Sequence, residues 1–167
     1  MIESEVWRCE RPFSSSSFYG TYPQGFLAKA LALFPDAKDI IHCPSGSLTG
    51  PGITIDAVRD EKRCPQIVAS AHNIPLPDNS CDLFLSDPPY EVKDSKKYGC
   101  APFPLGGMMY EAHRLVRPGG YFGLLHLWCP AYSPVHFTLV KQVAIITGLE
   151  QRVRLFSIFK SNKKVEL

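Results

Sequence analysis

The sequence has no closely paired cysteines, no long apolar run and little net charge. Its six cysteines lie far apart with no C-x-x-C pair, so we expect neither a zinc site nor another metal centre. No stretch approaches the ~18 consecutive apolar residues that cross a bilayer, and residues 1–5 lack the basic and apolar regions of a secretory signal. A net charge of +2 allows contact with nucleic acid without requiring it. We therefore expect a cytoplasmic protein with reduced cysteines and no membrane span.

The length of the chain indicates one domain. A chain of 167 residues can bury a substantial core, and apart from four serines at 14–17 it has no repeat or low-complexity block. We expect a single domain over residues 1–167 that begins with an irregular lead over residues 1–21.

The most informative stretch is an apolar run that ends in an aspartate and two prolines. Residues 83–86 are typical of a buried parallel strand, because such strands are apolar on both faces. The strand must stop at Asp87, because Pro88 and Pro89 fix φ and remove two backbone donors. The sequence thus predicts a rigid corner, with Tyr90 beside it, at the edge where open α/β sheets bind ligands. The alternative is an ordinary loop in which Asp87 caps the next segment.

This corner carries a resemblance to a known family. Asp-Pro-Pro-Tyr at residues 87–90, after an apolar strand, resembles the fourth motif of the S-adenosylmethionine-dependent amino methyltransferases. These enzymes methylate adenine N6 or cytosine N4 in nucleic acids. Residues 73–82 resemble the segment that leads into this strand in the wider superfamily. Residues 111–120 resemble its helix-to-strand joint, in which we expect Pro118 and Gly119 to end the helix.

The resemblance spans residues 22–159 and implies a fold. It implies an α/β, Rossmann-like class I methyltransferase domain, with a mostly parallel seven-stranded sheet, an antiparallel C-terminal strand and helices on both faces. Residues 143–148 and 152–160 alternate and turn as an antiparallel hairpin would, and a helix over residues 135–146 is the alternative. Lys160, Lys163 and Lys164 then predict a solvated basic tail.

The resemblance also gives the corner a chemistry. A ring amine is a poor nucleophile, and groups that accept its N–H bonds stabilise the positive charge that grows on it. Asp87 and the carbonyl of Pro88 would take that role, Pro89 would keep the corner rigid, and Tyr90 would stack on the flipped base. Methyl transfer would be direct. Adenine N6 is favoured over cytosine N4, because aspartate rather than serine heads the motif.

The resemblance implies S-adenosylmethionine as the cofactor and a pocket along three turns. Family members bind it with a tyrosine ahead of a helix and with a glycine-rich loop after the first strand. Here the loop keeps one glycine in place, and its serines would act as hydroxyl donors or simply form a turn. The cofactor-binding residues that we expect are Tyr22, Cys43, Pro44, Ser45, Gly46, Ser47, Asp56, Ala71, His72 and Asp87.

Three further assignments have alternatives. Tyr22 would belong to the cofactor pocket, or it would lie at the structural N-terminus of a surface helix. Asp56 ends a predicted strand and is suited to bind both ribose hydroxyls, or else it caps a helix. Ser70 stands where the family has an aspartate for the adenine amine, so Ala71 and His72 would contact adenine through backbone amides and the ring face. A histidine in a loop that faces solvent is the other interpretation of His72.

The partners follow from the same resemblance. The fold uses nearly the whole chain, so we expect no separate target-recognition domain. The substrate would be DNA or RNA with an exposed target, or selectivity would come from a homo-oligomer or a partner protein. A lysine-rich loop over residues 91–99 would contact phosphates or be merely solvated. Two other functions stay open: methylation of a protein glutamine or small amine, and a non-catalytic cofactor-binding or partner-binding subunit.

Overall fold

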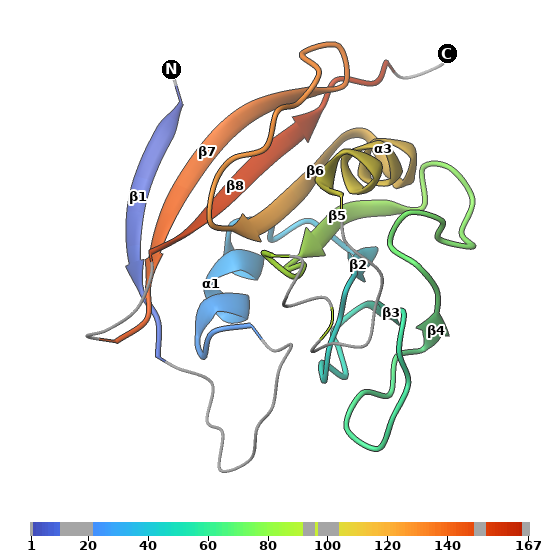
Figure 1. Ribbon diagram of the computed structural model, residues 1–167. Coiled ribbons are helices and arrows are strands. Elements are labelled where there is room, and N and C mark those ends of the chain that lie inside the picture. The colour runs from blue at the N-terminus through green and yellow to red at the C-terminus, as the bar shows by residue number, and fades with distance from the viewer. Residues whose placement is uncertain (1, 11–21, 92–95, 97–103, 149–152, 165–167) are drawn as a thin grey trace.

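The computed structural model describes residues 2–10, 22–91, 96, 104–148 and 153–164 (Figure 1). The elements in chain order are β1 (Glu3–Arg8), α1 (Phe26–Ala32), β2 (Ile40–His42), β3 (Ile53–Asp56), β4 (Ile67–Val68), β5 (Cys81–Ser86), α3 (Leu105–Leu115), β6 (Val116–His126), β7 (Phe137–Ile146) and β8 (Arg154–Ser161). The lysine-rich loop predicted over residues 91–99 lies outside the described residues, except for Glu91 and Lys96.

All of these strands form one sheet, in the order β1-β7-β8-β6-β5-β2-β3-β4. The pairs from β6 to β4 are parallel, whereas β8 is antiparallel to both β6 and β7. Figure 1 shows them as one continuous twisted surface with β1 and β4 at its two ends. The predicted mostly parallel sheet with a reversed C-terminal strand is confirmed, and so is the hairpin, because residues 137–146 form a strand rather than a helix.

The sheet has one strand more than the sequence predicts. Residues 3–8, expected to be irregular, pair in parallel with β7 at the outer edge of the sheet. One large side chain anchors this strand: Trp7 is buried, with ring centroids 6.3 Å from Phe26 and 6.1 Å from Phe156. The other residues of β1 are exposed, so no alternating apolar pattern marks it in the sequence. The prediction of an irregular lead is therefore wrong for this part.

The sheet buries a different apolar cluster on each face. Successive strand residues point to opposite faces, so Leu83 and Leu85 belong to the cluster that includes α1, and Phe84 belongs to the cluster that includes α3. Burying an aromatic or aliphatic side chain of this size stabilises the fold by about 1.5–3 kcal/mol. The helical cover is thinner than predicted, because the connections after β2, β3, β4 and β6 are fully described and contain no helix.

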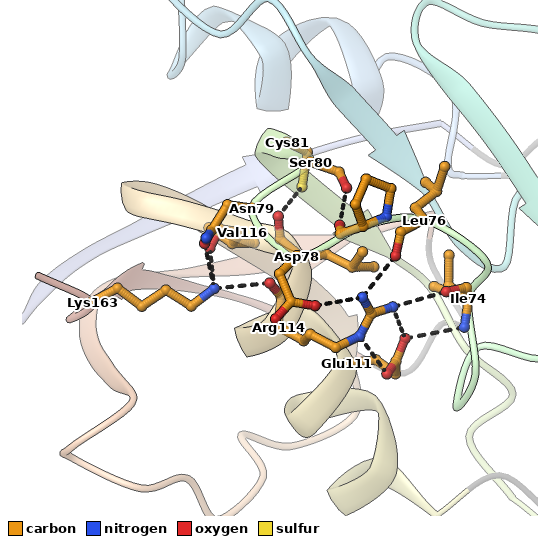
Figure 2. Close-up of polar contacts among 12 residues, drawn as sticks. Ile74, Leu76, Asp78, Asn79, Ser80, Cys81, Glu111, Arg114, Val116 and Lys163 are labelled. Carbon is orange, nitrogen blue, oxygen red and sulfur yellow. Dashed lines mark hydrogen bonds and ion pairs between the residues drawn. The ribbon is translucent and has the colours of Figure 1, made fainter. Parts of the chain in front are cut away.

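Two of the resembled segments are held together by one arginine. Arg114, at the end of α3, donates to the carbonyls of Leu76 (2.7 Å) and Ile74 (2.8 Å). It also donates to both carboxylate oxygens of Glu111, at 3.0 and 2.9 Å, and to Asp78 at 2.9 Å. Glu111 in turn accepts the backbone N–H of Ile74 at 3.1 Å. Figure 2 shows these contacts as one network, which fixes the segment before β5 against α3.

The C-terminal tail adds a third contact to this network. The Lys163 ammonium donates to the Asn79 side chain (2.7 Å) and to the carbonyls of Arg114 (2.8 Å) and Val116 (2.9 Å), as Figure 2 shows. The main effect on the pKa of Lys163 is partial burial, which lowers it. The prediction of a solvated lysine is therefore wrong at this position, because carbonyls left unpaired at the end of α3 need donors.

The joint between α3 and β6 also differs from the prediction. The helix ends at Leu115, earlier than Pro118 and Gly119, and both of these residues lie within β6. The strand bulges there, because Cys81 pairs with Val116 and Leu83 pairs with Tyr121. Gly119 has φ +75°, which an L side chain rarely adopts, so the glycine serves the bulge rather than the helix end.

Candidate active site

The carboxyl ends of four parallel strands meet at one edge of the sheet. The last residues of β2, β3, β5 and β6 are His42, Asp56, Ser86 and His126. β8 runs the opposite way, so its first residue, Arg154, lies at the same edge. The predicted residues 43–47, 56 and 87–90 stand at or directly after these strand ends. They therefore share the edge at which α/β sheets bind ligands.

Asp87 follows β5 and is held by two neighbours. The Tyr90 hydroxyl donates to its Oδ1 at 2.5 Å, and the Arg154 guanidinium lies 3.8 Å from its Oδ2. Only 15% of the side chain is exposed. Burial raises the pKa of Asp87 to about 6, against the opposing effects of Arg154 and Tyr90. The carboxylate thus lies in a corner where its charge is costly, with Pro88 buried beside it.

The ring of Tyr90 is already in contact on two sides. The ring centroid of His126 lies 5.0 Å away in an edge-on arrangement, and the Arg154 guanidinium carbon lies 5.5 Å from the Tyr90 centroid. A cation over an aromatic face is attracted to it. Stacking of Tyr90 on a base stays a prediction, and on the face that Arg154 covers it requires that the guanidinium move.

Tyr22 lies ahead of α1 and reaches β2. Its hydroxyl lies 3.3 Å from His42 Nδ1, and His42 Nε2 lies 2.9 Å from the carbonyl of Pro51. A carbonyl only accepts, so Nε2 donates to it and Nδ1 accepts from the tyrosine. Burial lowers the pKa of His42 to about 4, so the imidazole is neutral. Burial, and next the carboxylate of Asp87, raise the pKa of Tyr22, which places Tyr22 within electrostatic reach of the corner.

The turn after β2 is largely buried, and only some of its polar groups have hydrogen-bond partners. The backbone N–H of Ser45 donates to the carbonyl of Ile55 at 2.8 Å. The Ser45 hydroxyl is buried and has no hydrogen-bond partner among the described residues. Cys43 is a buried free thiol whose pKa burial raises, and Pro44 and Ser47 are half-buried. An unsatisfied buried hydroxyl calls for a ligand or a water.

Asp56 joins this turn to β3. Its Oδ2 accepts the N–H of Gly46 at 2.9 Å, and its Oδ1 accepts the N–H of Val58 at 3.0 Å. Gly46 has φ +54°, a left-handed conformation that glycine adopts more readily than other residues. The structure therefore brings the predicted loop and the predicted carboxylate together. Each carboxylate oxygen keeps a further acceptor site that a ribose hydroxyl could use. Binding of ribose by Asp56 stays a prediction.

Ala71 and His72 lie on the other face, against α3. Ala71 is buried in the cluster that includes α3. His72 Nε2 lies 3.1 Å from the carbonyl of Pro104, and a Cβ at Gly107 would meet the imidazole at 2.8 Å. The ring thus packs against the first turn of α3. Contact of either residue with adenine stays a prediction.

The structure adds residues that the motifs do not reveal. Arg154 begins β8 and faces Asp87, and His42 orients Tyr22. The sequence itself places His126 and Trp128 at the end of a predicted strand, on the substrate side or in the core, and in the structure His126 is buried and contacts both Tyr90 and Trp128. The only signal in the sequence is a polar residue at the end of an apolar strand. That signal does not say which residues meet across the sheet.

Neither a candidate metal-binding cluster nor a helix able to span a membrane occurs among the described residues. No three His, Cys, Asp or Glu side chains in this part of the chain lie close enough together to hold a metal ion. None of the helices in it is both long and apolar enough to cross a membrane.

Comparison with known proteins identifies the fold. No protein-family model and no curated protein matches the chain. Among solved structures, it is similar to TrmN from Thermus thermophilus. The two chains are 20% identical, the match covers 81% of this chain and 48% of TrmN, and the TM-score is 0.55. It thus spans about half the length of TrmN.

Two further structures match over most of their own length. The Escherichia coli protein yhhF, assigned as a methyltransferase, has 11% identity, 87% and 90% coverage of the two chains and a TM-score of 0.56. Burkholderia thailandensis 1,6-didemethyltoxoflavin-N1-methyltransferase, solved with its substrate and S-adenosylhomocysteine, has 11% identity, 81% and 76% coverage and a TM-score of 0.56. With the strand order described above, these similarities show that the chain has the Rossmann-like fold of the class I methyltransferases.

Proposed function

We propose that this protein is an S-adenosylmethionine-dependent methyltransferase that acts on an exocyclic amine of a nucleobase in DNA or RNA, with adenine N6 favoured over cytosine N4. One observation carries the proposal. Asp87 is largely buried, with 15% of its side chain exposed, at the carboxyl edge of the sheet ahead of two prolines, and it accepts a hydrogen bond from Tyr90. A carboxylate in such a corner can accept the N–H bonds of an amine and stabilise the charge that develops on it.

The turn after β2 fits the cofactor. The Ser45 hydroxyl is buried without a partner in the described part of the chain, and the Asp56 oxygens keep acceptor sites beside Gly46. A hydroxyl and a carboxylate are the groups that bind an amino acid end and ribose hydroxyls. S-adenosylmethionine would supply a methyl group as an electrophile. The neighbour from Burkholderia thailandensis contains S-adenosylhomocysteine, the product of that transfer.

The corner would act by position and charge. Asp87 Oδ1 now accepts from Tyr90, so a substrate amine would take over that acceptor. The carbonyl of Pro88 would accept the second N–H. Asp87 must be ionised to accept from the amine, and the positive charge of Arg154 favours the ionised form. Alignment of the amine would supply most of the acceleration.

Sequence selectivity would come from outside these elements. The described strands and helices belong to the sheet and its two clusters, and they offer no second substrate-reading unit. We therefore propose an already exposed target, or a second copy of the chain or a partner protein that selects it.

A non-catalytic binding subunit is the second candidate. The Asp87 carboxylate already has two partners, Tyr90 and Arg154, and a corner satisfied in this way can be structural. A small-molecule amine is a further substrate to include, since the neighbour from Burkholderia thailandensis is the N1-methyltransferase of a small molecule, 1,6-didemethyltoxoflavin.

One labelling experiment separates these functions. The protein is incubated with S-adenosylmethionine labelled in its methyl group and with single-stranded DNA, RNA and a mixed protein extract, and the products are identified by mass analysis of nucleosides and amino acids. We expect label in N6-methyladenine. Label only in glutamine overturns the nucleobase assignment. If titration calorimetry shows cofactor binding without any transfer, the protein is a binding subunit.

A further inference from the structure

Three rings lie in series at the end of β6. Tyr90 and His126 have centroids 5.0 Å apart, and His126 and Trp128 have centroids 4.1 Å apart, both edge-on. His126 is buried, with 1% exposed, whereas Trp128 is 50% exposed. The series therefore begins at the Asp87 corner and ends in an indole that solvent can reach.

Tyr90 is poorly placed to hold a flat ring by itself. Its hydroxyl donates to Asp87, the Arg154 guanidinium lies over its ring, and His126 contacts it edge-on. A base that stacks on the face of Tyr90 that Arg154 covers must first displace the guanidinium. The Trp128 indole is the larger aromatic surface, and half of it is open to solvent.

A second exposed apolar residue stands near the same strand ends. The antiparallel pairing of β6 with β8 ends at His126 and Leu155, so Trp128 follows the end of β6 and Val153 directly precedes β8. Val153 is 53% exposed. An exposed indole and an exposed valine thus stand just beyond the strand ends that carry His126 and Arg154.

The buried imidazole supplies an independent observation. His126 Nδ1 is buried and has no hydrogen-bond partner within the described residues. Buried polar atoms without partners are rare, and those in ligand sites are satisfied by the ligand or by a water that it orders. This unmet atom lies in the ring that Trp128 contacts.

We infer that Trp128 is the platform on which the aromatic ring of the substrate stacks, with Val153 at its rim. This inference rests on the proposed function and adds a substrate class to it, a flat heteroaromatic ring such as a nucleobase. An aliphatic amide, such as a glutamine side chain, has no aromatic face with which to stack. Stacking on an aromatic side chain depends little on the base, so Trp128 would give affinity rather than discrimination between bases.

Tryptophan fluorescence tests the contact without catalysis. The chain has two tryptophans, and Trp7 is buried with 6% exposed, so Trp128 is the accessible one. Adenosine and cytidine are titrated with and without saturating S-adenosylhomocysteine, and N-acetylglutamine amide serves as the non-aromatic control. We expect both nucleosides, and not the amide, to quench wild-type emission, and no quenching in W128F, which keeps Trp7. No quenching by either nucleoside overturns the inference.

Three variants then measure the contribution of the ring. Nucleoside affinity, determined by saturation-transfer NMR, should fall about five-fold to about a hundred-fold in W128L, and W128F should retain most of it. Val135→Ala is the control, because Val135 is 79% exposed in the same connection. Wild-type affinity in W128L overturns the inference even if methyl transfer to nucleosides is found. Stacking without any methyl transfer leaves the inference standing and removes the proposed reaction.

Discussion

The parallel strands begin at one edge of the sheet and end at the opposite edge, and the polar groups at these two edges find hydrogen-bond partners to different extents. At the edge where β5 begins, Arg114, Arg117 and Lys163 each donate to several carbonyls and side chains. At the edge where β5 ends, buried polar atoms lack partners. In the described residues these atoms are Ser45 Oγ after β2, His126 Nδ1 at the end of β6, Thr147 Oγ1 after β7 and Ser157 Oγ within β8, where it pairs with Leu124 near the end of β6.

This contrast indicates which edge serves the fold and which awaits a ligand. A buried polar group without a hydrogen-bond partner costs about 1–3 kcal/mol. Several such groups in one region therefore indicate that a ligand or an ordered water satisfies them. Asp87, whose pKa is raised by burial, lies at the same edge. A carboxylate whose pKa is raised by burial is typical of a functional site, whereas the lowered pKa of Lys163 at the first edge accompanies hydrogen bonds that hold the fold. The first edge therefore stabilises the chain, and the second is where chemistry is to be sought.

Replacing Asp87 tests the second edge most severely. Asp87→Ala should lower methyl transfer by about 100-fold or more, because it removes the acceptor for the amine. Binding of S-adenosylmethionine, measured by titration calorimetry, should persist. Turnover close to wild type in this variant would remove the corner from the mechanism.

Replacing Arg114 tests the first edge. Arg114→Leu leaves the carboxylate of Glu111, 6% exposed, without its main partner, and should lower the free energy of unfolding by about 3 kcal/mol. The double variant that also carries Glu111→Leu should recover part of this loss. Lys141→Gln, which breaks exposed pairs with Glu3 and Glu5, is the matched control and should cost less than about 1 kcal/mol. Urea denaturation decides the matter, and equal losses in Arg114→Leu and the control would remove the contrast between the edges.

The pH dependence of the rate examines how Asp87 is kept ionised. Burial raises the pKa of Asp87 to about 6, and the groups that face it are Arg154, Tyr90 and Tyr22. Only the ionised form is a full acceptor for the amine, so the rate should fall as the pH drops through about 6. Arg154→Gln removes a charge that lowers the pKa, so this limb should move to higher pH by about one pH unit.

Direct titration of Asp87 by carbon NMR provides the check that is independent of rate. A raised pKa in the folded state also means that Asp87 contributes stability at low pH, which is lost as the pH rises through about 6. Arg154→Lys should restore part of the wild-type profile. An unchanged limb in Arg154→Gln would show that the guanidinium does not help to keep Asp87 ionised.

The smallest expected effect distinguishes the two edges most directly. Ser45→Ala removes a buried hydroxyl that has no partner among the described residues, so stability should stay the same or rise slightly. Affinity for S-adenosylmethionine should fall by about 1 kcal/mol, or about five-fold, because the variant loses one hydrogen bond to the ligand. Thermal denaturation with and without the cofactor measures both effects. A destabilised variant with unchanged affinity would assign Ser45 to the fold.

Local sequence predicted the parts of the fold that depend on neighbouring residues. The apolar strand before Asp87, the turn at Gly46 and the C-terminal hairpin all follow from residues close in the chain. The N-terminal strand escaped prediction because one buried ring, Trp7, and a backbone ladder suffice for an edge strand. The role of Lys163 escaped because the carbonyls that it bonds belong to a distant helix end.

Residue types alone set where β5 stops, because two prolines have no N–H to continue a ladder, and they also set which carboxylate stands at that end. The surroundings of Asp87 depend instead on how the whole chain packs. The antiparallel pairing of β8 with β6 brings Arg154 to the edge where the parallel strands end, and the end of β6 brings His126 to Tyr90. Strand order and direction set these contacts. The order and direction result in turn from burial on both faces of the whole sheet rather than from any local pattern.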